Sequence, residues 1–310
     1  MTPRPPAPET DPASRPAATS GPVARDTVAV GYDRPADRPR AEALAERLGL
    51  AVAKKFNDPR PLRLAYAPPP RAAGAPSRPR ARPVDGPAPS GPLELRVVAE
   101  GHPLGGGHGV SVQLTGLDTT SPAGRSRKSP LHRAAGLGRR GASGASPTTV
   151  LDATAGLGED AWLLAAAGCR VTALERHPVV HALLADGLAR ARAAAPDVAE
   201  RITLLPCGEA ADYLASPDAA AGGYDVVLLD PMFPEAAKRK TAERKPMRVL
   251  RWLAGEDQDA DSLWPAAVAA ARRRVAVKRP RHAPDLAGQP PVARHAGRGV
   301  RFDVYPVTNP

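Results

Sequence analysis

From about residue 148 onward, short apolar runs alternate with stretches of helical periodicity. The runs have the length and apolar content of buried strands, and they lie at 148–154, 170–175, 202–206, 224–230 and 272–279. Helical patterns fill 159–168 and 178–195, and further helical stretches precede the last two runs. This alternation predicts an α/β fold, in which a mostly parallel sheet is covered by helices on both faces. Ligands of such sheets bind at the carboxyl ends of the strands.

The chain before residue 136 has a weaker and different pattern. It contains a short alternating strand, an amphipathic helix and two more alternating stretches, at 27–33, 40–52, 93–99 and 109–116. We expect the last two stretches to pair as a hairpin with a loose glycine-rich loop. These pieces predict a small α+β amino-terminal domain over residues 26–135, followed by the larger α/β domain over 136–310.

Two proline-rich segments have almost no apolar periodicity. Residues 1–25 and 67–92 contain many of the chain's 38 prolines and few large apolar residues. Such segments cannot bury enough apolar surface to offset the entropy lost on ordering. We therefore expect a disordered tail and a flexible insertion within the amino-terminal domain.

The charge balance favours an anionic partner. The 43 Lys and Arg residues against 32 Asp and Glu give a net charge of +11 and an isoelectric point near 10.2, so nucleic acid is the first candidate. Only 7 of the basic residues are Lys, which is also the usage expected of a GC-rich coding sequence.

The two cysteines, Cys169 and Cys207, lack metal-ligand spacing, so no metal is expected. We find no signal peptide and no apolar run of membrane-spanning length, which predicts a soluble cytoplasmic protein without a membrane partner.

The stretch "LDATAGLGED", residues 151–160, predicts a cofactor site. Gly156 and Gly158 would let the backbone approach a ligand at the amino end of a helix, and Glu175 ends the next strand, where it can accept hydrogen bonds from ribose hydroxyls. A dinucleotide fits the same pattern, which leaves an NAD-dependent oxidoreductase open. Asp152 favours a cationic ligand over a pyrophosphate, and S-adenosylmethionine (SAM) carries a sulfonium, an amino group and no phosphate.

The stretch "VVLLDPMFPEAAKRK", residues 226–240, carries the candidate chemistry. Asp230-Pro231-Met232-Phe233 resembles the Asp/Asn-Pro-Pro-aromatic motif of methyltransferases that modify exocyclic or amide nitrogens. The Asp230 carboxylate and the Pro231 carbonyl can accept the hydrogens of an amine, and Phe233 can stack on the target base. We therefore expect these three residues to be catalytic, with no metal required.

Basic residues follow this motif and also end the strand at 272–279. A basic loop beside a base-binding site would hold phosphates of RNA. The predicted RNA contacts are Lys238, Arg239, Lys240, Lys245, Arg248, Lys278 and Arg279.

Taken together, the motifs resemble one family. The long stretch from "DATAGLGEDAWLLAAAG" through "ALERHP", with "LLDPMFP", "KPMRVL", "VAVKRP" and "RFDVY", closely resembles the ribosomal RNA small-subunit methyltransferase J family, the guanine-N2 methyltransferases of bacterial 16S rRNA. The resemblance runs from about residue 148 to 305. It implies a Rossmann-like SAM-dependent methyltransferase fold with a last strand, "VRFDVYP", inserted antiparallel, and a partner that is 16S rRNA or the small ribosomal subunit.

The resemblance also implies how SAM is held. The expected contacts, added to Asp152, Gly156 and Gly158, are Glu159, Asp160, Glu175, Arg176, Gly208, Glu209 and Asp230. This chain has Glu159 where the family usually has a basic residue, and the family's basic stretch before the domain survives only as "RSRKSPLHRAAGL", residues 125–137. Two alternatives stay open: an N-methyltransferase acting on DNA, a protein amide or a small amine, and an inactive RNA-binding protein with a methyltransferase fold.

Overall fold

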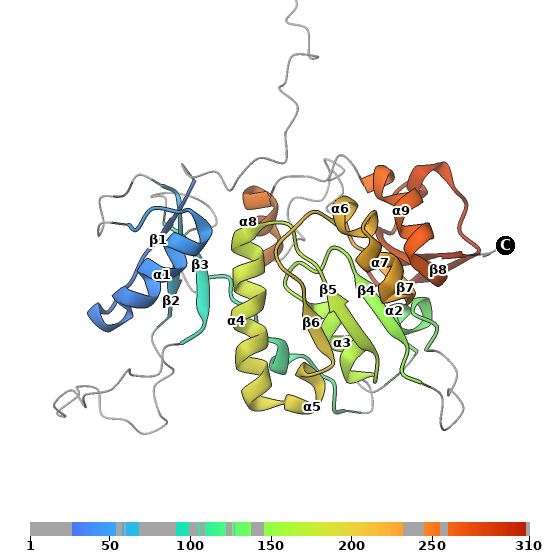
Figure 1. The fold of residues 1–310 in the computed structure, drawn as a ribbon, viewed down its shortest axis with the longest axis horizontal. Helices are drawn as coiled ribbons and strands as arrows, with labels where there is room; N and C mark the ends of the chain where they lie inside the picture. The colour runs from blue at the N-terminus through green and yellow to red at the C-terminus, as the bar shows by residue number, and fades with distance from the viewer. Residues whose placement is uncertain are drawn as a thin grey trace, which may run out of the picture.

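The fold consists of two β-sheets on opposite sides of a long helix. The computed structural model describes residues 27–53, 58, 60–67, 91–98, 105, 109–121, 126, 128–137, 146–231, 245–254 and 260–307. In these ranges a three-stranded sheet and a seven-stranded sheet flank α4 (Pro178–Ala194) (Figure 1). The predicted tail at 1–25 and most of the predicted insertion at 67–92 lie outside the described residues. Within them, none of the helices combines the length and the apolar character that a membrane crossing requires.

The large sheet confirms the predicted α/β architecture. Its strand order is β6-β5-β4-β7-β8-β10-β9, and the first five strands run parallel. The parallel strands are β4 (Thr149–Asp152), β5 (Arg170–Ala173), β6 (Ile202–Leu204), β7 (Tyr224–Leu229) and β8 (Ala271–Pro280). β10 (Val300–Pro306) pairs antiparallel with β8, as the resemblance implied. The outer strand β9 (Ala293–Ala296) was not predicted, because its four residues carry no apolar run.

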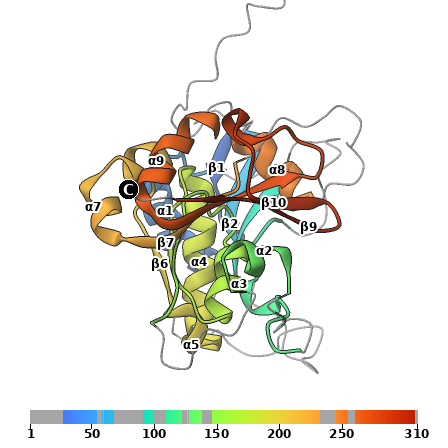
Figure 2. The ribbon, with the colours of Figure 1, turned by 90° about the vertical axis from the view of Figure 1, so that its right-hand side faces the viewer.

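Helices cover both faces of this sheet, because successive strand residues point to opposite sides. Val226 and Leu228 of β7 belong to the core shared with α3 (Glu159–Ala166) and α4, whereas Val227 and Leu229 belong to the core shared with α9 (Leu263–Ala270). The second face is also covered by α6 (Ala210–Leu214) and α7 (Pro217–Gly222). Figure 2 shows α7 beside α9. Short helices α2 (Pro130–Ala134) and α5 (Pro196–Ala199) complete the first face.

The amino-terminal sheet differs from the predicted pattern. It has the order β1-β2-β3, formed by β1 (Val28–Val30), β2 (Leu62–Tyr66) and β3 (Leu93–Val97), beside α1 (Arg38–Leu48). β2 was not predicted. The expected hairpin of 93–99 with 109–116 is confirmed only at Leu95 and Val110, which form an isolated antiparallel bridge with two hydrogen bonds of 2.8 Å. Residues 114–116 form a 3-10 turn instead of continuing a strand, because the chain from Val112 onward packs on α4.

The two sheets share one hydrophobic core through α4. Gly187 of α4 lies so close to the 110–117 segment that an added Cβ would stand 2.2 Å from Val112 Cγ1. Asp186 accepts a hydrogen bond from the amide of Leu93 at 3.0 Å, and Arg190 Nη2 donates to the Val112 carbonyl at 2.5 Å. Residues from both sheets form a continuous buried cluster around this contact. The division of the chain at residues 135 and 136 stays a prediction.

Candidate functional site

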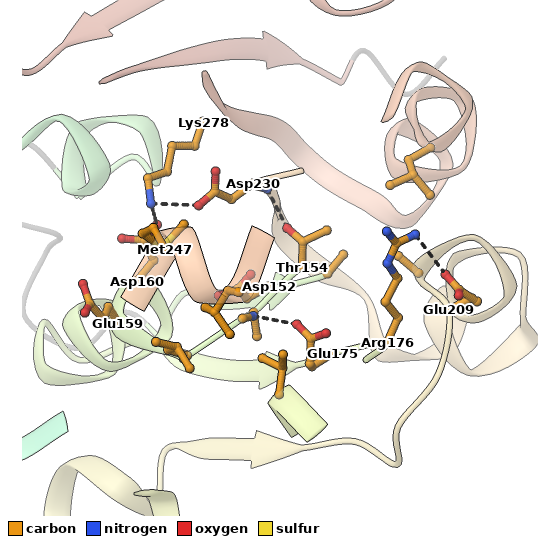
Figure 3. A pocket seen from close by; sticks show the side chains of 18 residues that line it. Asp152, Thr154, Glu159, Asp160, Glu175, Arg176, Glu209, Asp230, Met247 and Lys278 are labelled. Carbon is orange, nitrogen blue, oxygen red and sulfur yellow. Dashed lines mark hydrogen bonds and ion pairs between the residues drawn. The ribbon is translucent and has the colours of Figure 1, made fainter. Parts of the chain in front are cut away.

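A pocket opens at the carboxyl ends of the parallel strands, where the sequence places its candidate residues. Asp152 ends β4, Glu175 lies two residues beyond β5, and Asp230 follows β7 directly. Their side chains line one cavity together with Lys278 near the end of β8 (Figure 3). The strand-end prediction is confirmed for these carboxylates, which come from segments far apart in the chain.

Lys278 joins two of the carboxylates. Its Nζ lies 2.9 Å from Asp160 Oδ2 in the first turn of α3 and 2.8 Å from Asp230 Oδ2 (Figure 3). The two carboxylates raise the pKa of Lys278 despite its burial, so the side chain stays protonated. The backbone amide of Asp230 donates to Thr154 Oγ1 at 2.6 Å. Asp230 is therefore held from two sides, by a cation and by a hydroxyl.

Asp152 is buried beneath this group. Its residue is 2% exposed, and Oδ1 has no hydrogen-bond partner within the described structure. Burial, together with the charges of Asp160 and Asp230, raises its pKa well above the ordinary value of 3.8. A buried carboxylate oxygen without a donor destabilises the fold unless a ligand supplies one, although a backbone hydrogen bond from Thr154 partly offsets the rise in pKa of Asp152.

We expect the change Asp152→Asn to stabilise the protein at alkaline pH and to weaken cofactor binding. The raised pKa means that the folded state holds a proton that the unfolded state releases above about pH 4. The contribution of Asp152 to stability is therefore full below that pH and is lost as pH rises through its folded-state pKa. Thermal unfolding should show a gain of about 1–3 kcal/mol for the variant at pH 8 and none near pH 4, which is the range for a buried unpartnered polar group. If the difference in stability between the variant and the wild type were the same at both pH values, this assignment would be contradicted.

The opposite end of the pocket is arranged around Glu175. Its carboxylate accepts hydrogen bonds from the backbone amides of Gly156 at 2.9 Å and His177 at 2.7 Å. Arg176 Nη1 lies 3.8 Å from Glu209 Oε2, and both side chains line the pocket. The Glu175 oxygens keep acceptor capacity beyond these two amides, as a ribose contact requires. Gly208 is not among the residues that line the pocket, and its amide donates to the Glu175 carbonyl at 3.3 Å, so its contact with the cofactor stays a prediction.

The two glycines of the turn have different roles. Gly156 has φ +54, lines the pocket, and would place an added Cβ in open space, so it suits close approach of a ligand. Gly158 has φ +78, but its added Cβ would lie 2.5 Å from Leu184 Cδ1 of α4. Gly158 is not among the residues that line the pocket, and its contact with the cofactor stays a prediction. Its positive φ and its close approach to Leu184 both favour glycine at this position.

Alanine at these two positions should separate binding from stability. Both changes incur the left-handed backbone penalty of about 1–2 kcal/mol. Gly158→Ala also overpacks the α4 contact, so we expect a total loss of at least about 2 kcal/mol in the free energy of unfolding. Gly156→Ala should lose the smaller amount and weaken cofactor affinity about tenfold or more. Thermal unfolding and calorimetric cofactor titration of both variants measure this difference, and the reverse order of stabilities would refute it.

One wall of the pocket is apolar and was not predicted. Met247 and Leu250 come from α8 (Lys245–Ala254), and Leu263 comes from α9. The available signal was the amphipathic pattern of "KPMRVL", which we used for the family resemblance and for its basic residues but not for its apolar ones. Thr154, which fixes Asp230, was also missed, because a hydroxyl in a glycine-rich turn carries no distinctive pattern.

Among the described residues, the predicted RNA contacts Lys278 and Arg279 point to opposite faces of β8. Lys278 lies in the pocket between two carboxylates, and Arg279 is 4% exposed on the α9 side of the sheet, a placement that does not fit direct phosphate contact. Arg248 is partly exposed on α8, which Lys245 begins. The predicted contacts Lys238, Arg239 and Lys240 lie outside the described residues, as does the predicted catalytic residue Phe233. Pro231 is buried directly after Asp230.

The charge of the pocket fits SAM better than a dinucleotide. Six acidic side chains line it against two basic ones: Asp152, Glu159, Asp160, Glu175, Glu209 and Asp230 against Arg176 and Lys278. A pyrophosphate would be repelled by this excess of negative charge. A sulfonium and an ammonium group would be attracted to it, and the ammonium could donate to the orphaned Asp152 oxygen. This arrangement disfavours the oxidoreductase alternative.

Comparisons with known proteins agree with this geometry. The family model described as "Putative SAM-dependent methyltransferase" matches residues 109–307. Two proteins named ribosomal RNA small subunit methyltransferase J are similar to this chain. The one from Marinobacter nauticus is 51% identical over 52% of this chain and 58% of its own length. The one from Thioalkalivibrio sulfidiphilus is 44% identical over 64% of this chain and 82% of its own length. The chain thus matches little more than half of the first relative.

A solved structure extends the similarity over the whole fold. The crystal structure of a SAM-dependent methyltransferase from Neisseria gonorrhoeae is 30% identical, covers 91% of this chain and 96% of its own, and superposes with a TM-score of 0.58. The fold, the acidic pocket at the strand ends and the relatives all lead to the same assignment. The chain belongs to the ribosomal RNA small subunit methyltransferase J family of SAM-dependent methyltransferases.

Proposed function

We propose that this protein transfers a methyl group from SAM to the exocyclic N2 of a guanosine in 16S rRNA of the small ribosomal subunit. The observation that carries the proposal is the placement of Asp230 in the lining of an acidic pocket. Its carboxylate lies 2.8 Å from Lys278 Nζ, and its backbone amide donates to Thr154 Oγ1 at 2.6 Å. The names of the relatives support rRNA as the substrate class. The choice of N2 rests on the resemblance.

The residues of the chain provide the two functions that the reaction needs. Bound SAM would supply an electrophilic methyl group on its sulfonium. Asp152, Glu175 and Glu209 offer acceptors to its polar groups, and Gly156 leaves space for it beside the backbone. Met247, Leu250 and Leu263 supply an apolar wall against which flat rings can pack.

Asp230 acts on the methyl acceptor. The lone pair of an exocyclic amine is delocalised into the base, which makes the nitrogen a poor nucleophile. A carboxylate and a carbonyl that accept its two N–H groups localise the pair and aim it at the methyl group. The Asp230 carboxylate, with a side chain that is 35% exposed, can do this, and the Pro231 carbonyl is the second acceptor in the proposal. Because the chemistry is a direct displacement, positioning supplies most of the rate.

Substrate class can be tested by offering labelled SAM with one acceptor at a time: small-subunit rRNA, duplex DNA or an amide-bearing peptide. We expect label in the rRNA reaction alone, because the charge of the pocket and the names of the related proteins both support a base in RNA as the methyl acceptor. Label in DNA or peptide instead would support the alternative N-methyltransferase. SAM binding without transfer to any acceptor or to assembled subunits would support the inactive RNA-binding protein.

A further inference from the structure

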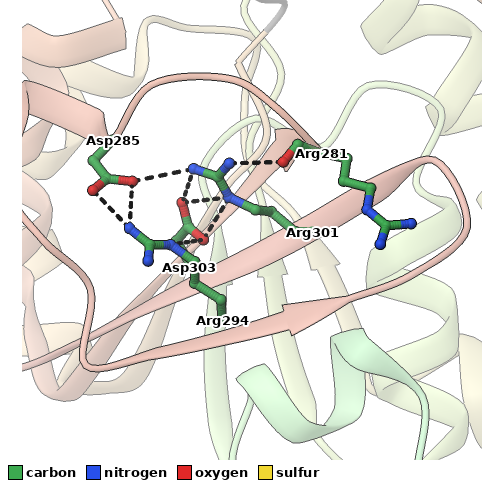
Figure 4. Close-up of polar contacts among 5 residues, drawn as sticks. All are labelled: Arg281, Asp285, Arg294, Arg301 and Asp303. Atoms are coloured by element: carbon green, nitrogen blue, oxygen red, sulfur yellow. Dashed lines mark hydrogen bonds and ion pairs between the residues drawn. The ribbon is translucent and has the colours of Figure 1, made fainter.

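Basic side chains at the outer edge of the large sheet are matched by acids on one face only. On the α9 face, Arg301 of β10 donates to Asp303 from Nε and Nη2, each at 2.9 Å, and to Asp285 at 3.2 Å. Arg294 of β9 donates to both oxygens of Asp285 at 2.8 and 2.7 Å (Figure 4). These two arginines are neutralised by two carboxylates, and the network fixes the loop between β8 and β9.

The opposite face carries cations from three elements. His295 of β9 pairs across β10 with Phe302, which pairs with Lys278, so His295 shares the face of Lys278. Arg274 lies four residues before Lys278 on the same strand and therefore on the same face. Arg133 belongs to α2, which packs on β9 and β10. We call Arg133, Arg274 and His295 the α2 basic cluster.

Packing fixes the position of this cluster. The Arg274 guanidinium lies against the carboxyl end of α2, where a Cβ added to Gly136 would stand 3.1 Å from its Cζ. At the other end of α2, Pro130 Cγ would stand 3.5 Å from a Cβ on Gly297 in the turn after β9. Arg133 is exposed, and Arg274 and His295 are partly exposed. The three side chains are therefore held on a supported surface that solvent can reach.

Within the described part of the chain, no carboxylate forms an ion pair with the cluster. Burial, and then the charges of Arg133 and Arg274, lower the pKa of His295. The surrounding sequence from 121 to 146 contains six Arg and Lys residues and no Asp or Glu. In the described structure, Arg294 and Arg301 on the α9 face are therefore paired with carboxylates, whereas Arg133 and Arg274 on the α2 face are not.

We propose that the α2 basic cluster binds backbone phosphates of the substrate RNA. Two arginines and a histidine match a run of phosphates, which RNA presents and which contributes most of its electrostatic affinity. His295 stands two strands from Lys278, roughly 10 Å along the sheet, so RNA held here extends beside the pocket mouth. The proposal rests on the proposed function, and it puts phosphate binding on α2, β8 and β9 in addition to the predicted segment at 238–248.

The test is the double change Arg133→Gln and Arg274→Gln, assayed by filter binding of small-subunit rRNA at several salt concentrations. Each lost phosphate contact lowers the slope of log affinity against log salt by about 0.7–0.9, so the slope should fall by about 1.4–1.8. At about 0.1 M salt the dissociation constant should rise on the order of 25-fold. The KM for RNA should rise in step, while SAM affinity and the rate at saturating RNA stay within about twofold of wild type.

The matched control is Arg170→Gln with Arg192→Gln, which removes the same charge from exposed residues of β5 and α4. An equal loss of RNA affinity in both double variants would overturn the proposal, because bulk charge would then explain the effect. Unchanged affinity in the cluster variant would also overturn it. If the wild-type protein itself binds no rRNA, the proposed function fails. If the wild type binds rRNA and the cluster variant binds it equally well, only the proposal for the α2 basic cluster fails.

Discussion

Asp230→Ala is expected to reduce methyl transfer about 10³-fold or more while leaving RNA affinity within about twofold of wild type. Removing one group that is aligned with the reacting atoms typically costs about 10²- to 10³-fold in rate, and this change also removes the anion that orients Lys278. RNA affinity should persist, because phosphate contacts outside the pocket supply it. Single-turnover transfer and filter binding of the same preparation measure the two quantities.

Two controls sharpen this result. Asp230→Asn keeps one acceptor oxygen and the size of the side chain, so it should retain more activity than the alanine variant. Asp212→Ala removes an exposed carboxylate from α6 and should leave transfer unchanged. Parallel loss of RNA affinity and transfer in Asp230→Ala, with normal thermal stability, would contradict the role of Asp230 as acceptor of the amine.

Lys278→Met should lower the rate at saturating RNA about 10²-fold and leave the KM for RNA unchanged. Without the ammonium group, Asp160 and Asp230 repel each other across the position that Nζ now occupies, at 2.9 and 2.8 Å from their oxygens. Asp230 then loses its orientation. The acid limb of the pH–rate profile should move to higher pH, because loss of the cation favours protonated carboxylates.

This prediction separates two roles for Lys278. A phosphate-binding lysine, as the sequence suggested, would change the KM for RNA and lower the salt slope by about 0.7–0.9. A lysine that positions Asp230 changes the rate and the pH profile instead. Lys278→Arg keeps the charge and should recover part of the rate, and a shift confined to the KM for RNA in the methionine variant would restore the original assignment.

The sequence was informative where one element suffices for the inference. β7 and β4 contain the apolar runs "VVLL" and "VL" directly before Asp230 and Asp152, so both strands and these acids could be placed at one edge of a parallel sheet. β2 and β9 could not be found, because five and four residues beside proline-rich or polar sequence give no resolvable period. The hairpin was predicted too long, because the alternating segment pairs with β3 only at Val110 and then packs on α4.

The site was less predictable where partners are distant in the chain. Lys278 and Asp160 are 118 positions apart, so nothing local distinguishes this lysine from one that faces solvent. The same is true of Gly158, whose close neighbour Leu184 belongs to the following helix. Residue types at strand ends can therefore be predicted to share a pocket, whereas the pairing among them depends on tertiary packing.

The most direct test is methyl transfer from labelled SAM to small-subunit rRNA isolated from a strain that lacks this gene, followed by nucleoside analysis of the product. The account predicts label in N2-methylguanosine and little transfer to rRNA from the parent strain, in which the site is already modified. Label in any other nucleoside, or SAM binding without label in rRNA or in assembled small subunits, would contradict it.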